Sequence, residues 1–150
     1  MSLVIRRAVP ADAPTISDVV IRALHALDTP DYPPPAIEQL ARRFTPEAVG
    51  DMLQQRWMLV ATRGDQVVGT ASLDAEGFVR TVFIQPDCQG LGIGTRLLDA
   101  LHVHAVEAGA AYLRVRSSTT AVGFYERLGY TRAAETPDGP GHTVVMTRAL

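Results

Sequence analysis

The chain has 150 residues, 47% of them hydrophobic and 20% charged, which is the composition of one ordinary globular domain spanning residues 1–150. Its formal net charge of −2 offers no broad basic field for nucleic acid, and no apolar run is long enough to span a bilayer. All 14 basic residues are arginine, so chemistries that need a lysine amine, such as the Walker A phosphate loop and the pyridoxal Schiff base, are excluded.

Targeting signals and disulfides are also not expected. The chain starts with a short apolar stretch followed by charge, the reverse of the order in a signal peptide. Cys88 is the only cysteine, so no internal disulfide can form. We therefore predict a cytoplasmic protein without a membrane partner.

Hydrophobic periodicity, together with the glycine and proline positions, divides the chain into helices and strands. In chain order we predict a strand over Leu3–Ala8, a helix that Asp12 caps, helices over Ala36–Arg43 and Pro46–Gln55, strands over Trp57–Thr62, Gln66–Leu73 and Phe78–Ile84, a helix that Gly109 stops, a strand over Tyr112–Arg116, a short helix that ends at Gly129, and strands over Tyr130–Ala134 and His142–Arg148. The proline-rich segment 29–36 is predicted to be a loop that excludes regular helix. This order of elements predicts an α/β domain built on a mixed sheet.

A glycine-rich turn carries the strongest chemical signal. The strand over Phe78–Ile84 leads through Pro86 into Gln89-Gly-Leu-Gly-Ile-Gly94, which opens an amphipathic helix. Glycines let successive backbone N–H groups point into one concavity, and the helix adds its free N–H groups and the positive end of its dipole. Such a turn suits a phosphate or pyrophosphate, and a plain tight turn is the alternative. The dinucleotide fingerprint fits poorly, because Leu97 stands where its third glycine belongs.

Residues 89–94 match the Q/R-x-x-G-x-G/A motif of the GNAT superfamily of N-acetyltransferases, and the similarity covers nearly the whole chain. Val82-Phe-Ile-Gln-Pro86 resembles the family's fourth strand, and residues 121–130, AVGFYERLGY, resemble its A-x-x-F-Y-E-K-L-G-F segment. Val67–Thr70 and Ile5–Asp12 also resemble family members. The resemblance implies a GNAT-like α/β fold. In that fold about seven strands form a mixed, mostly antiparallel sheet flanked by helices, with a V-shaped cofactor cleft between strands 4 and 5.

The same resemblance implies acetyl-CoA as the cosubstrate. In the family the pyrophosphate lies on the N–H groups of the glycine turn, and the pantetheine arm pairs with the fourth strand as if it were an added strand. A bulge splays that strand from the fifth, and an N–H group near Ile84 would polarise the thioester carbonyl. The cofactor-binding residues implied here are Val82, Phe83, Ile84, Gln89, Gly90, Leu91, Gly92, Ile93, Gly94, Thr95, Ser118 and Phe124. Ser118 stands where many relatives have asparagine, and core packing is the alternative for Phe124.

Two catalytic residues are predicted from the resemblance and the nearby acidic residues. Tyr125 matches the general acid that protonates the departing thiolate in many relatives, although it could also only pack or hydrogen-bond the cofactor sulfur. Glu76 is the candidate general base, and deprotonation through ordered water is the alternative. Other candidates for the base are Asp74, His25, Asp28 and Asp31.

We therefore predict an N-acetyltransferase that transfers acetyl from acetyl-CoA to a primary amine by direct attack in a ternary complex. The acceptor is a small-molecule or peptide amine, and carboxylates at Asp28, Asp31 and Glu38 hint that it is cationic. No metal is expected, since His102 and His104 lie about 200° apart around a helix. Relatives commonly form homodimers, so a homodimer is also considered.

Two other interpretations stay open. A CoA- or acyl-CoA-binding sensor or interaction module would keep the cleft without the chemistry. A protein that binds a nucleotide or another phosphate ligand would use the same anion site. Arg114 and Arg116 alternate on one strand face, where they either face solvent or meet a phosphate or a substrate carboxylate.

Overall fold

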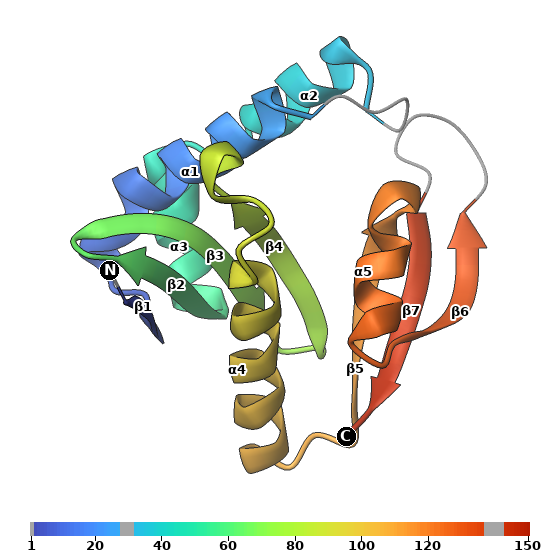
Figure 1. Ribbon diagram of the computed structural model, residues 1–150. Coiled ribbons are helices and arrows are strands. Elements are labelled where there is room, and N and C mark those ends of the chain that lie inside the picture. Colours follow the sequence, from blue (N-terminus) through green and yellow to red (C-terminus); the bar gives the residue numbers. More distant parts are fainter. Residues whose placement is uncertain (1, 28–31, 137–142) are drawn as a thin grey trace.

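Seven strands form one sheet in the order β1-β2-β3-β4-β5-β7-β6 in the computed structural model, which describes residues 2–27, 32–136 and 143–150. Every neighbouring pair is antiparallel except β4 and β5, which are parallel (Figure 1). The predicted mixed, mostly antiparallel sheet of a GNAT-like fold is therefore confirmed.

The element boundaries lie within two residues of those predicted. The strands are β1 (Leu3–Arg7), β2 (Trp57–Arg63), β3 (Gln66–Leu73), β4 (Phe78–Ile84), β5 (Tyr112–Ser118), β6 (Thr131–Thr136) and β7 (Thr143–Ala149). The helices are α1 (Ala13–His25), α2 (Pro34–Ala41), α3 (Pro46–Gln55), α4 (Ile93–Glu107) and α5 (Val122–Arg127), with short 3-10 turns η1 (Pro10–Asp12), η2 (Pro86–Cys88) and η3 (Thr119–Ala121). The turn predicted at 137–141 lies outside the described residues. None of the described helices is both long enough and apolar enough to cross a membrane.

The prediction that the proline-rich segment excludes helix was wrong at its C-terminal end. Pro34 and Pro35 form the first turn of α2, and Pro33 is its N-cap. The N–H groups of a first helical turn have no partner within the helix, so proline there forfeits no helical hydrogen bond. The helix therefore starts inside the proline run.

Asp12 is the N-cap residue of α1, as predicted, but its side chain makes no capping hydrogen bond to that helix. The turn η1 runs directly into α1, so Asp12 already has a helical backbone, and Val9 takes the N-cap position of η1. The Asp12 carboxylate accepts the Val9 N–H at 2.8 Å and two hydrogen bonds from the Arg6 guanidinium at 2.8 and 2.9 Å. These bonds tie β1 to the start of α1.

Replacing Asp12 by asparagine is expected to lower the free energy of unfolding by about 1–3 kcal/mol at pH 7, because charge-assisted hydrogen bonds are lost. The Arg6 guanidinium and the Val9 N–H hold the pKa of the Asp12 carboxyl below its usual value of 3.8. Its contribution is therefore fully present above pH 3.8 and disappears as the pH falls through the lower folded-state pKa. Urea unfolding at pH 7 and at pH 3 should show a difference between the two proteins that shrinks in acid. Asp18→Asn, which removes only an exposed pair with Arg22, should change stability by about 0.5 kcal/mol or less.

Two apolar cores cover the two faces of the sheet (Figure 1). One core joins β2 and β3 to α1 and α3, and includes the fully buried Ile16, Val19 and Val49. The other core lies under α4 and α5 and includes the fully buried Leu97 and Leu101. Helices therefore pack on both faces of β4, through α1 on one side and α4 on the other, while β5 packs against α5.

A bulge in β4 separates the two central strands. Phe83 is paired with Thr70 and Arg80 with Ser72, so two residues of β4 stand opposite Ala71 alone. One of these two is Thr81, whose φ of 56° makes it the one non-glycine residue at positive φ among the described residues. Bulges bend a strand and disrupt its ladder locally.

The pairing of β4 with β5 stops just before this bulge. Two residue pairs join the strands, Phe78 with Arg114 and Val79 with Val115. Beyond them β4 diverges from β5 (Figure 1). The predicted bulge and V-shaped opening between strands 4 and 5 are therefore present, with the closed end of the V at Val79.

Candidate functional site

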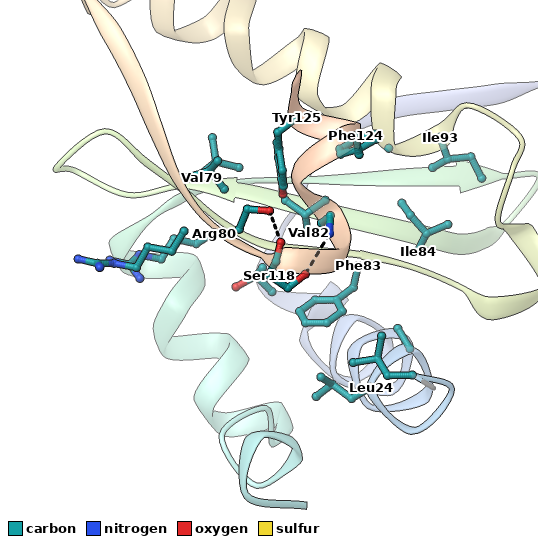
Figure 2. A pocket seen from close by; sticks show the side chains of 18 of the residues that line it. Leu24, Val79, Arg80, Val82, Phe83, Ile84, Ile93, Ser118, Phe124 and Tyr125 are labelled. Carbon is teal, nitrogen blue, oxygen red and sulfur yellow. Dashed lines mark hydrogen bonds between the residues drawn. The ribbon is translucent and has the colours of Figure 1, made fainter. Parts of the chain in front are cut away.

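A cleft of about 840 Å³ occupies the opening between β4 and β5. It extends from the end of α1 and from α2 and α3, along β4, to the glycine turn, and its other side is formed by β5 and α5. Figure 2 shows Tyr125, Phe124 and Ile93 on one side of β4, with Phe83 and Leu24 on the opposite side. A ligand lying in the cleft would thus pass between the two helical layers.

The glycine turn has the backbone that the sequence predicted. Gly90 and Gly92 both adopt φ of 78°, a left-handed conformation that favours glycine, and Gly92 is the N-cap of α4. No side chain caps α4, so its first-turn N–H groups and the positive end of its dipole are available to an anion in the cleft. This end of the cleft can hold a phosphate without a charged side chain.

The structure brings nearly all the predicted cofactor-binding residues to this cleft. Those that line it are Val82, Phe83, Ile84, Gln89, Gly90, Gly92, Ile93, Gly94, Thr95, Ser118 and Phe124. Leu91 is not part of the lining, and 58% of its surface is exposed. Its predicted contact was through the backbone, so this placement leaves that contact a prediction.

β4 offers a free backbone edge beside the cleft. Beyond Val79 its residues have no β5 partner, while Gly69 and Thr70 of β3 hold Ile84 and Phe83 from the other side. An extended ligand can therefore pair with residues 82–84 as an added strand. The Ile84 side chain packs closely against β3, since a Cβ at Gly69 would lie 2.9 Å from the Ile84 Cδ1 atom.

Tyr125 lies on α5 with 6% of its surface exposed, and it lines the cleft. Its ring packs edge-on against Phe124 and Tyr130, with centroids 5.1 and 5.5 Å away. Burial raises the pKa of Tyr125 above its ordinary value of 10. The hydroxyl is therefore neutral throughout the neutral pH range and can donate a hydrogen bond into the cleft.

Phe124 and Ser118 have structural contacts as well as places in the cleft. The Phe124 ring packs against the α4 core and lies so close to Gly94 that a Cβ there would be 3.2 Å from its Cζ atom. The Ser118 hydroxyl accepts the Ala121 N–H at 3.3 Å and so caps the start of η3. Both residues therefore help to hold the wall of the cleft in place.

Glu76, the candidate base, lies in the exposed turn between β3 and β4 and is not among the residues that line the cleft. Asp74 accepts the N–H groups of Glu76 and Phe78 and the Nε–H of Arg80 at 2.7 Å. Burial alone would raise the pKa of Asp74, but these hydrogen bonds hold it below the usual value of 3.8. Asp74 is therefore occupied as a structural acceptor and is a weak base. Glu76 as the base stays a prediction.

The charged residues that line the cleft are basic, whereas the sequence indicated an acidic surface for a cationic acceptor. Among the described residues the cleft is lined by no aspartate or glutamate, and its charged residues are Arg43, Arg56, Arg80, Arg116 and Arg127. Glu38 bonds His25 at 2.9 Å between α2 and α1, and both are exposed. Asp28 and Asp31 lie outside the described residues.

The remaining singled-out residues have structural partners. His102 is buried and bonds the Tyr130 hydroxyl at 2.8 Å, and His104 stacks on Trp57 with centroids 3.6 Å apart. The described part of the chain contains no group of three metal-ligating side chains. Burial raises the pKa of the Cys88 thiol, which fits an unreactive residue.

Thr81 and Arg56 are parts of the site that were not predicted from the sequence. Nothing in a β-branched residue signals a left-handed conformation, and Arg56 follows α3 some 25 residues before its hydrogen-bond partner Thr81. Arg80 could have been found, because a charged residue inside an otherwise apolar strand is unusual.

Comparisons with known proteins agree with this geometry. Residues 28–146 match the family model described as the acetyltransferase (GNAT) domain. The chain is 34% identical over 94 residues to the peptidyl-lysine N-acetyltransferase YjaB of Salmonella typhimurium, covering 63% of this chain and 58% of that protein. It is 35% identical over 86 residues to the mycothiol acetyltransferase of Geodermatophilus obscurus, covering 55% of this chain and 26% of that protein. The chain thus matches little more than half of the first relative and about a quarter of the second.

Solved structures also resemble the chain over its whole length. A GCN5-related N-acetyltransferase from Rhodopseudomonas palustris superimposes with a TM-score of 0.90 at 26% identity, covering 100% of this chain and 97% of that one. The PaiA N-acetyltransferase of Thermoplasma acidophilum, in complex with coenzyme A, superimposes with a TM-score of 0.86 at 18% identity over 100% of both chains. The second likeness concerns the fold alone.

Proposed function

The chain belongs to the GNAT acetyltransferases, and from this premise we propose that it transfers the acetyl group of acetyl-CoA to a primary amine by direct attack in a ternary complex. The observation that carries the proposal is the cleft between β4 and β5. It brings together three parts that this chemistry needs, namely an uncapped helix N-terminus, a free strand edge and the buried Tyr125 hydroxyl.

The residues of the cleft fit acetyl-CoA along its length. The N–H groups after Gly92 would hold the pyrophosphate, and the free edge of β4 at residues 82–84 would pair with the pantetheine arm. The thioester would then lie near Val82 and Ile84, opposite Tyr125. Acetyl-CoA supplies the activated acyl group when bound.

Tyr125 has one proton to offer at the sulfur end of the reaction. Its raised pKa keeps the hydroxyl protonated, so it can donate a hydrogen bond that strengthens as negative charge develops on the departing sulfur. The thiol that forms has a lower ordinary pKa, near 8.5, so complete transfer from tyrosine alone runs uphill. We therefore propose that Tyr125 donates its proton to the departing sulfur while its oxygen receives a proton from the attacking nitrogen, so that the C–N bond forms, the C–S bond breaks and the hydroxyl is restored.

The amine must attack in its neutral form. No described carboxylate lines the cleft, so the proton would leave through water, and Glu76 could act only by way of water from its exposed turn. The arginines of the lining assist this step, because nearby positive charge disfavours the ammonium form.

The first test is a calorimetric titration of the protein with acetyl-CoA, CoA and ADP. We expect acetyl-CoA to bind with micromolar affinity and clearly more tightly than ADP, since the arm adds contacts along β4 that ADP lacks. Gly92→Ala should weaken acetyl-CoA binding about tenfold. The left-handed conformation costs an alanine about 1–2 kcal/mol, so the turn would relax and move its N–H groups away from the position that binds the anion.

Gly50→Ala is the matched control for this titration. Gly50 lies inside α3, where an added Cβ would have no other atom within 4 Å, so alanine should slightly stabilise the helix and leave acetyl-CoA binding unchanged. Equal affinities for ADP and acetyl-CoA would overturn the proposal in favour of a general phosphate site. Tight acetyl-CoA binding with no turnover of any amine would favour a CoA-binding sensor.

A further inference from the structure

Three guanidinium groups cover one aromatic ring at the closed end of the V. The Phe78 ring is 6% exposed, and the guanidinium carbons of Arg80, Arg114 and Arg116 lie 5.2, 4.3 and 5.0 Å from its centroid. Cation–π contact explains how like charges can gather there, but it does not neutralise them. The positive charge of this cluster is therefore still available to a ligand.

A fourth arginine reaches the same place from another element. Arg56 follows α3, is half-buried, and donates from Nη1 to the Thr81 hydroxyl at the bulge, at 2.9 Å. Burial lowers the pKa of Arg56, and the positive charge of Arg80 lowers it further, while the charge of Asp74 acts in the opposite direction. Of these four arginines, Arg80 is the one for which an ion pair is described, with Asp74, so the positive charge of the four exceeds that of their carboxylate partners.

Arg56, Arg80 and Arg116, the arginine group, line the cleft at the end remote from the glycine turn. The phosphates of the proposed cosubstrate would occupy the glycine-turn end, at the start of α4. The amine must therefore approach the acyl carbon from the region of the bulge and the arginine group. The surrounding lining there is mainly apolar and comprises Leu24, Leu40, Phe44, Met52 and Phe83, together with Tyr32 and Arg43.

Building on the proposed acetyltransferase function, we propose that the acceptor is a small amine that carries a carboxylate, such as an amino acid with an apolar side chain. The carboxylate pairs with the arginine group, and the apolar body lies against the apolar lining. A bare alkylamine or a cationic polyamine would leave the half-buried Arg56 guanidinium without an anion and add further positive charge beside it. The charge of the lining thus selects for an acid.

Planar guanidinium groups favour this assignment chemically. They present paired N–H donors that match the two oxygens of a carboxylate, and such charge-assisted pairs are the stronger hydrogen bonds of proteins. The remaining excess of positive charge disfavours the ammonium form of a neighbouring amine, so the same group would bind the acid and favour the attacking nucleophile.

The test measures binding to the CoA-loaded protein, so that it does not depend on turnover. Leucine, methionine and phenylalanine are each titrated against their primary amides and their decarboxylated amines, and an acidic peptide with a free amino terminus is added as a further arm. We expect at least one free acid to bind about tenfold or more tightly than its amide, as a charge-assisted contact implies. Rates of CoA release with acetyl-CoA should follow the same order.

Arg56→Gln should abolish this preference for acid over amide. Arg116→Gln should weaken the preference, and because Arg116 is exposed this variant provides the test if Arg56→Gln does not fold. Arg22→Gln, on the outer face of α1, is the control and should keep the preference. Acetyl-CoA affinity, measured separately, should be equal in all these proteins and reports both folding and the cosubstrate site.

The inference is overturned if amides or simple amines bind as well as the acids, or if the acidic peptide binds better than every free acid. Failure of the acetyltransferase proposal would instead appear in the parent protein, as the absence of acetyl-CoA binding or as binding without turnover of any amine.

Discussion

Replacing Tyr125 by phenylalanine is expected to lower kcat by about 10²-fold or more while leaving acetyl-CoA affinity nearly unchanged. The substitution keeps the ring, so packing against Phe124 and Tyr130 is retained. It removes the hydroxyl of the buried tyrosine through which α5 lines the cleft. The hydrogen bond to the departing sulfur would be lost in the transition state, where it matters most.

The pH dependence gives this prediction a second measurement. Because burial raises the pKa of Tyr125, the hydroxyl should stay protonated up to at least pH 10, the ordinary tyrosine value. The rate of the parent protein should therefore rise with pH as the amine loses its proton, with no fall from tyrosine ionisation in that range. Tyr112→Phe removes a hydroxyl from a tyrosine with 52% of its surface exposed and should leave kcat unchanged. Equal turnover of the Tyr125→Phe variant and the parent would exclude Tyr125 from the mechanism.

Local sequence signals were enough to predict the parts of the site that depend on backbone conformation. Gly90 and Gly92 have the positive φ angles that a turn into a helix requires, and glycine is the residue that adopts them at the least cost. The richness of the segment in valine, phenylalanine, threonine and isoleucine placed β4 correctly from Phe78 to Ile84. Both signals are local, so neither depended on contacts with distant parts of the chain.

The parts that sequence could not predict depend on tertiary contacts. Asp12 is the N-cap residue of α1, as expected, but its carboxylate binds the guanidinium of Arg6 on β1, and no local signal predicted that partner. The arginine group combines residues from the end of α3, β4 and β5, and no spacing in the sequence brings these together. Glu76 looked suitable as a base from its position before β4, yet the turn that precedes the strand leaves it outside the cleft lining.

The bulge in β4 leads to a further large effect. Deletion of Thr81 is expected to weaken acetyl-CoA binding by at least about 10²-fold, because a regular strand would stay beside β5 and occupy the space of the ligand. Thr81 is the surplus residue of the bulge, so its loss would pair Val82 with Ala71 and leave Arg80 and Phe83 in their present registers. The side chains on either side would keep their faces, and only the bend would be removed.

The variant without Thr81 should still fold, so that its loss of acetyl-CoA binding can be distinguished from general unfolding. A threonine in the left-handed conformation costs about 1 kcal/mol or more, and the deletion removes that strain together with the hydrogen bond from Arg56. Thermal unfolding should therefore stay close to that of the parent, while calorimetry shows the loss of acetyl-CoA binding. Thr81→Gly is the matched control, because it keeps the bulge, relieves the strain and removes the same hydroxyl, so its acetyl-CoA affinity should stay within a few-fold of the parent. If the deletion variant folds and binds acetyl-CoA as tightly as Thr81→Gly, the bulge does not create the cleft. The divergence of β4 from β5 would then have to come from the packing of α1 and α5 on the two strands.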